Sequence, residues 1–115
     1  RFKMNANAVI VKGTTEDVAS KMVDVGAKSI VVVVDITAGA GSLVVTIKGV
    51  TPSGYKYPLL VSSSLSGVST TPLRIFPGAT PSSNAVANDV VPATIEISVD
   101  VTGVITYGID IIEGE

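Results

Sequence analysis

The last quarter of the chain alternates strictly between apolar and polar side chains. The apolar series lies on both sides of Thr102-Gly103 and comprises Ile95, Ile97, Val99, Val101, Ile105, Tyr107, Ile109 and Ile111. A period of two is typical of a β-strand with one buried and one solvated face. Thr102-Gly103 has the composition of a two-residue reversal. The pattern therefore predicts an antiparallel hairpin formed by residues 94–102 and 105–111.

A second region is β-branched at nearly every position. Residues 28–37 are mostly β-branched, and the run is too short for a buried helix. We therefore expect a strand that is apolar on both faces. The small residues 38–41 have the composition of a turn, and Leu43, Val45 and Ile47 then recur at every second position. These two segments predict a second hairpin.

The middle of the chain carries shorter signals. Residues 51–54 (Thr-Pro-Ser-Gly) predict a β-turn, because proline is favoured at its second position and glycine at its fourth. In the strand expected next, one face is shared by alternate residues: Tyr55, Tyr57, Leu59 and Val61. Pro58 lacks a backbone donor and favours a sheet edge there. Residues 62–71 are expected to be a linker to a strand at 73–76.

The N-terminal region leaves two interpretations open. Residues 1–8 are expected to form a short arm before a first strand at 9–11. Residues 14–22 have features of a short helix, with Thr14 three positions before Asp17 as an imperfect capping box. The alternative is a loop followed by a short strand at 22–25.

These segments together predict the fold class. The 115 residues suit one domain, and 46% are apolar but only 4% aromatic, with valine and isoleucine dominant. We expect an all-β protein, an antiparallel β-sandwich of jelly-roll or Ig-like type with about seven to eight strands. The domain is expected to span residues 9–115, after the arm.

The composition disfavours catalysis. Histidine and cysteine are absent, which removes the commonest proton carrier near neutral pH and the best nucleophile. Carboxylate pairs remain possible, either Glu96 with Asp100 or Asp35 with Asp110. Alternation already places all four on solvated strand faces, so we predict no catalytic residue and no cofactor.

Three further groups of residues have side chains that could bind a ligand. Calcium ligands could come from Asn84, Asn88 and Asp89, or from Glu16 with Asp17, but neither group has the spacing of a calcium loop. Backbone hydrogen bonds within turns are the favoured interpretation, so no metal site is predicted. Tyr55 and Tyr57 could form a sugar-stacking platform, although packing against the core is commoner.

Charge and hydropathy limit the partners. The net charge is −2, the sequence pI is about 5.0 and no basic run occurs, which disfavours nucleic acid. The longest apolar run is far shorter than the roughly 20 residues that cross a bilayer, so no membrane partner is expected. The chain opens at Arg1 instead of Met, which leaves open whether upstream residues were removed.

Protein partners remain. Residues 79–92 form a long turn-rich segment, which in a compact domain often marks a binding loop. We predict that this loop and the arm make the interactions, through Arg1, Phe2, Lys3, Met4, Asn84, Val86, Asn88, Asp89 and Val90.

Several motifs resemble a β-sandwich module of virion structural proteins of tailed bacteriophages. In that module a strand ending in a hydrophobic-threonine pair, here Ile36-Thr37, precedes a Leu-x-Val-x-Ile strand, here residues 43–47. A Leu-Arg-hydrophobic-aromatic-Pro-Gly segment (73–78), a loop ending in Asp-Val-Val-Pro (89–92) and a closing pair of strands (94–111) follow in the same order.

The resemblance implies a function. It implies a non-enzymatic capsid decoration or minor capsid protein in the virion, a homo-oligomer with a trimer favoured, and the major capsid protein or other virion proteins as partners. A phage tail component is an alternative within this class. A cell-surface adhesion or carbohydrate-binding module is the alternative from another class, because fold alone does not choose between them.

Overall fold

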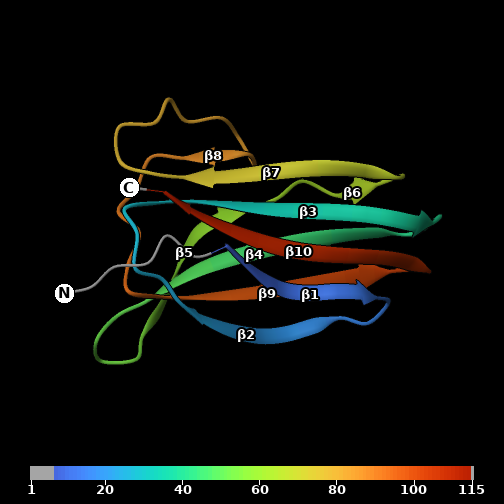
Figure 1. Ribbon diagram of the computed structural model, residues 1–115, viewed down its shortest axis with the longest axis horizontal. Helices are drawn as coiled ribbons and strands as arrows, with labels where there is room; N and C mark the ends of the chain where they lie inside the picture. Colours follow the sequence, from blue (N-terminus) through green and yellow to red (C-terminus); the bar gives the residue numbers. More distant parts are fainter. Residues whose placement is uncertain (1–6, 115) are drawn as a thin grey trace.

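The computed structural model describes residues 7–114, and its account of side chains begins at Ile10. This part of the chain forms ten β-strands and no helix (Figure 1). The strands are β1 (Asn7–Thr14), β2 (Val18–Asp24), β3 (Ser29–Gly39), β4 (Ser42–Val50), β5 (Lys56–Val61), β6 (Leu65–Ser66), β7 (Ser69–Ile75), β8 (Val86–Ala87), β9 (Thr94–Thr102) and β10 (Ile105–Gly114). The predicted count of seven to eight is wrong, because β6 and β8 are two-residue strands inside segments expected to be irregular.

The strands form two sheets that pack on each other. Sheet A has the order β1-β10-β3-β7-β8, and sheet B has the order β2-β9-β4-β5, with β6 joined to β4. All pairs are antiparallel except the short pair of β7 with β8. The prediction of an all-β, two-layer arrangement is confirmed.

The core lies between the two sheets, where alternation placed it. In β4 buried and half-buried residues alternate along all nine positions. In β3 the inward residues Ile30, Val32, Val34 and Ile36 are at most 1% exposed. Tyr107 of β10 is fully buried among these aliphatic side chains. Burial of this many branched side chains is the main stabilising contribution, at about 25 cal/mol per Å² of apolar surface.

The two predicted hairpins are wrong. β3 lies in sheet A and β4 in sheet B, and β9 lies in sheet B and β10 in sheet A, so each connection crosses between the sheets. The long pairings are instead β3 with β10 and β4 with β9. Both crossovers lie at the same end of the molecule, on the right in Figure 1. Alternation tells which side chains are buried but not which strand is the neighbour, because hairpin and crossover give the same pattern.

The N-terminal alternatives are resolved in favour of a strand. β2 spans Val18–Asp24 and pairs with β9, longer than the short strand expected at 22–25. β1 begins at Asn7, so the predicted boundary between arm and domain after residue 8 lies inside a strand that pairs with β10. The tertiary pairing overrides the weak helical signal of residues 14–22.

The β-turn at residues 51–54 is confirmed. The Gly54 amide donates to the Thr51 carbonyl at 2.9 Å, and β4 and β5 form a true hairpin. β5 is the edge strand of sheet B, as Pro58 suggested. The strand also contains a bulge, because Lys48 pairs with Pro58 and Ile47 with Leu60.

The bulge overturns the predicted common face of β5. Leu59 and its neighbour Leu60 are both buried, whereas Val61 is 40% exposed. Tyr57 is half-buried and packs against the core, and Tyr55 lies in the turn with 74% of its surface exposed. One extra residue in one strand shifts which side chains point inward.

The predicted linker at residues 62–71 is wrong in part. It contains β6, which pairs with β4, and the start of β7, which pairs with β3. The long loop at 79–92 contains β8, which lies parallel to the end of β7. Both segments are therefore paired with long strands of the two sheets.

Candidate protein-binding surface

The outer surface of sheet A carries several apolar side chains around the central strand β3. Val31 and Val33 of β3 point away from the core and are half-buried. Their cross-strand neighbours extend the surface, since Val31 pairs with Ile112 and Val33 with Pro72. Ile112 is 43% exposed. With Phe76, which follows β7, these side chains form what we call the apolar face: Val31, Val33, Pro72, Phe76 and Ile112.

Cations lie at one end of the apolar face. Arg74 is exposed and directly opposite Val31 on the neighbouring strand. A hollow of about 460 Å³ lies here, lined by Lys28, Ser29, Ile30, Val31, Arg74, Phe76 and Pro77. A positively charged side chain thus borders an apolar floor, which is a combination found at protein interfaces, where arginine is enriched.

Carboxylates lie at the other end. Asp35 pairs with Gly108, Asp110 pairs with Val33, and both aspartates are exposed. A second hollow of about 300 Å³ lies at this glycine, lined by Val11, Lys12, Gly13, Asp35, Thr37, Gly108 and Asp110. We call it the acidic notch. It exists because Gly108 has no side chain and the backbone of β1 comes close: a Cβ added there would lie 3.2 Å from the Val11 carbonyl oxygen.

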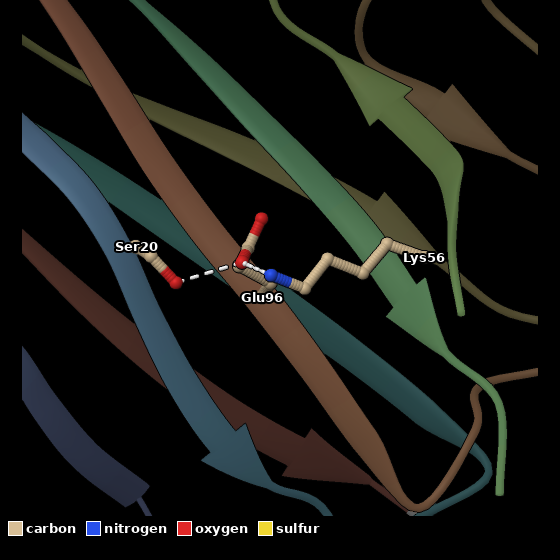
Figure 2. Close-up of polar contacts among 3 residues, drawn as sticks. All are labelled: Ser20, Lys56 and Glu96. Carbon is tan, nitrogen blue, oxygen red and sulfur yellow. Dashed lines mark hydrogen bonds and ion pairs between the residues drawn. The ribbon is translucent and has the colours of Figure 1, made fainter. Parts of the chain in front are cut away.

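The outer surface of sheet B is more polar and has its own charge network. Lys56 Nζ of β5 lies 2.6 Å from Glu96 Oε2 of β9, and Ser20 Oγ of β2 donates to the same oxygen at 2.7 Å (Figure 2). Glu96 is only 5% exposed although alternation predicts a solvated position. Ser20 comes from the neighbouring strand β2 and Lys56 reaches across β4 from β5, so three strands of sheet B are joined at one carboxylate.

This network changes the acidity of Glu96. The hydrogen bonds from Lys56 and then Ser20 hold its pKa below the ordinary value of 4.5. Burial acts in the opposite direction but is the smaller effect, because the carboxylate sits at the sheet surface under a thin layer of side chains. Lys56 is itself largely exposed, so the pair contributes modestly to stability.

The polar residues predicted to make interactions from the loop at 79–92 form hydrogen bonds with backbone atoms of the same chain. Asn84 has a positive φ of 64° and donates from Nδ2 to the Val61 carbonyl at 2.8 Å. Asn88 Oδ1 accepts from the Gly78 amide, and Asp89 Oδ1 accepts from the Val90 amide, both at 2.8 Å.

The rest of that predicted set divides in two. Val86 lies in β8, whereas Val90 is 67% exposed and free to contact a partner. The other predicted residues, Arg1, Phe2, Lys3 and Met4, lie outside the described residues.

Of the two carboxylate pairs considered for catalysis, the structure brings Asp35 and Asp110 together at the acidic notch but keeps Glu96 and Asp100 apart. Glu96 and Asp100 lie four residues apart on one strand, about 13 Å at the usual rise. Asp17 Oδ1 accepts from the Val101 amide at 2.7 Å, and the Glu16 carbonyl accepts from the Tyr107 hydroxyl at 2.6 Å. Residues 7–114 contain no group of three or more acidic side chains placed to hold a metal ion.

The sequence contains one signal of the apolar face. A strand that is apolar on both faces was predicted for residues 28–37, and in a two-layer fold one of those faces must be an outer surface. The charged residues at its two ends carried no such signal, because their neighbours come from strands far apart in the chain.

Comparisons of the chain with protein-family models, with curated proteins and with solved structures find no match. The described part of the chain has no helix long and apolar enough to cross a membrane.

Proposed function

We propose that this chain is a non-enzymatic virion structural protein, a capsid decoration or minor capsid component, that works by burying the apolar face against another protein. The observation that carries the proposal is the position of Val31 and Val33 on the outer side of a central strand, with Ile112 and Pro72 beside them. Contiguous apolar surface on a folded domain marks protein contact sites. The resemblance to phage structural modules supplies the virion context.

The properties of the fold support this use. Each sheet joins strands from distant parts of the chain, and its outer surface is held in shape by the packed core beneath it. A rigid surface loses little conformational entropy when it binds. A structural subunit needs such a surface and no reacting group.

The carbohydrate-binding alternative has less support. Its sugar platform requires Tyr55 and Tyr57 on one face, but Tyr57 packs against the core and only Tyr55 is exposed. A single exposed ring does not make a platform. A phage tail component would bury the same apolar face, so only the location of the chain in the particle distinguishes it from a capsid component.

Virions produced from the genome that encodes the chain provide the test. We expect mass spectrometry to find the chain in purified particles and gold-labelled antibody to locate it on the head. Shells produced without the gene should rebind the recombinant protein, and V33K should weaken this rebinding at least about tenfold because the lysine interrupts the apolar face.

The matched control is V44K on the outer surface of sheet B. Val33 lies opposite Asp110 and Val44 opposite Asp100, so each new lysine faces an aspartate, but only one is in the apolar face. Thermal unfolding checks that both variants fold. Absence of the chain from virions would refute the proposal, as would equal rebinding by V33K and wild type, or sugar binding on a glycan array that Tyr55→Ala abolishes.

A further inference from the structure

The pairing register places Arg74 and Gly108 at opposite corners around Val33. Arg74 lies one strand from β3 on the β7 side, in the row of Val31. Gly108 lies one strand from β3 on the β10 side, in the row of Asp35. Rows of outward side chains are about 6.8 Å apart and strands about 4.8 Å apart. The exposed arginine and the floor of the acidic notch are therefore equidistant from the same valine, in opposite directions.

We propose that the apolar face binds a second copy of this chain around a two-fold axis that passes through Val33. The proposal rests on the proposed function and identifies a second copy of the chain as the protein against which the apolar face is buried. A two-fold axis in the plane of the face sets each residue against the residue at the mirrored position across the axis, and we place the axis perpendicular to the line from Arg74 to Gly108. Val33 then meets Val33 of the other copy, and Arg74 lies over Gly108 of the other copy, twice per dimer.

The charges agree with this arrangement. An arginine placed at Gly108 of the other copy enters a notch whose floor has no side chain and whose sides carry Asp35 and Asp110. Lys12 also lines the notch, so the net charge there is negative. Asp35 already accepts a hydrogen bond from Thr70 Oγ1 at 3.0 Å, which leaves its second oxygen for the arginine. A planar guanidinium can bond both carboxylates at once.

The dimensions of the face are sufficient. A typical stable interface buries about 800 Å² on each partner. The molecule measures 43 × 26 × 25 Å, and two sides of this width crossed at a steep angle overlap over roughly 700 Å², close to that area. The axis sets the two β3 strands at a steep angle, as in orthogonal sheet packing. On sheet B the buried Glu96 is already bonded to Lys56 and Ser20 of its own chain.

Light scattering during size-exclusion chromatography tests the inference. Wild type should have twice the 11.7 kDa chain mass, and 0.5 M salt should weaken the dimer several-fold relative to 0.05 M. R74E should raise the dissociation constant about tenfold or more, and so should D35K/D110K, because each sets like charges together. K21E, which reverses an exposed cation on β2, is the matched control and should dimerise as wild type does.

Mixing the two defective variants gives the decisive result. In a mixed dimer of R74E with D35K/D110K, both contact sites again join opposite charges, so the 1:1 mixture should recover a dimer that neither variant forms alone. Recovery also shows that both variants fold. A wild-type monomer at 0.1 mM, a trimer, or failure of the mixture to associate would overturn the inference.

The results that test the dimer can be distinguished from the results that test the proposed function. A wild-type monomer that still rebinds shells through Val33 would refute the dimer and leave the proposed function standing. A chain that dimerises in solution but is absent from virions would refute the proposed function and leave the dimer standing.

Discussion

The Gly41 amide donates to the Val104 carbonyl at 2.7 Å, which ties together the tips of the two connections that cross between the sheets. The residues are far apart in the chain, and each belongs to a short connection between two long strands. Because β3 pairs with β10 and β4 with β9, the two crossovers stack, and their backbones touch at the tip. Close backbone approach of this kind requires glycine.

Adding one methyl group at this tip should be costly. A Cβ on Gly41 would lie 2.4 Å from the Thr102 carbonyl oxygen and 2.8 Å from the Val104 nitrogen, both of them backbone atoms that cannot move independently. We expect G41A to lower the free energy of unfolding by about 2–3 kcal/mol, measured by urea denaturation.

Gly54 is the control for that substitution. Its φ is +92° but nothing lies within 4 Å of an added Cβ, so G54A should cost only the backbone strain of about 1–2 kcal/mol. If G41A is as stable as wild type, the crossovers do not touch as described.

Gly49 and Tyr57 should be energetically coupled. The two residues pair across β4 and β5, and a Cβ on Gly49 would lie 2.4 Å from the Tyr57 ring. G49A should therefore destabilise wild type by about 2 kcal/mol but cost nothing in the Y57A background, where the space is vacant. A double-mutant cycle by chemical denaturation measures the coupling, and additive effects would contradict the packing of the ring over the glycine.

Removing the hydroxyl of Tyr107 should loosen the β1–β2 connection. This hydroxyl donates to the Glu16 carbonyl at 2.6 Å from a fully buried ring. Y107F should lower the free energy of unfolding by about 1 kcal/mol. Y55F alters an exposed ring in the β4–β5 turn and should have no measurable effect.

The same tyrosine should control stability at alkaline pH. Burial, followed by the charge of Asp17, raises its pKa from 10.0 to about 12. The folded state therefore favours the protonated phenol, and this contribution is complete below pH 10 and lost as pH rises toward 12. Unfolding curves from pH 8 to 12 should fall less steeply for Y107F than for wild type; parallel curves would contradict it.

Glu96 should act at the other end of the pH range. Its lowered pKa means that the folded state favours the carboxylate, so its contribution is present above pH 4.5 and lost as pH falls through the lowered value. E96Q should be about 1 kcal/mol less stable at pH 7, and the difference should shrink below pH 4.5. D100N, on the exposed end of the same strand, is the control and should follow wild type throughout. A difference independent of pH would show that the charge is not what stabilises.

The strands themselves were largely predictable, because their evidence is local. The alternation in β4, β9 and β10 was read directly from the sequence, and so was the turn at residues 51–54. β6 and β8 were missed because two-residue strands exist only through their partners β4 and β7. The prediction that alternate residues of β5 share one face is wrong because the strand contains a bulge, which its sequence does not indicate.

The candidate surface was predicted only in part. The prediction of a strand apolar on both faces at residues 28–37 implies one outward apolar face in a two-layer fold. That Val31 and Val33 lie on this outward face is known only from the structure. That Arg74 and Asp110 flank these valines could not be read from the sequence, because each comes from a strand dozens of residues away. The composition of the loop at 79–92 predicts a binding site there. Its polar side chains Asn84, Asn88 and Asp89 instead form hydrogen bonds with backbone atoms of the same chain.

That the chain forms strands, and which side chains of β4, β9 and β10 form the aliphatic core, was largely determined by the sequence alone, since a period of two places the apolar residues on one face. The burial of Glu96 and the inward face of β5 were decided by the tertiary structure. Which strands are neighbours was decided by the tertiary structure. The same alternation suits a hairpin and a crossover equally, and only the close contact of Gly39 and Gly41 with residues 102–105 lets the chain pass between sheets there. That choice brings β7, β3 and β10 together, and with them the apolar valines, the arginine and the two aspartates on one outer surface.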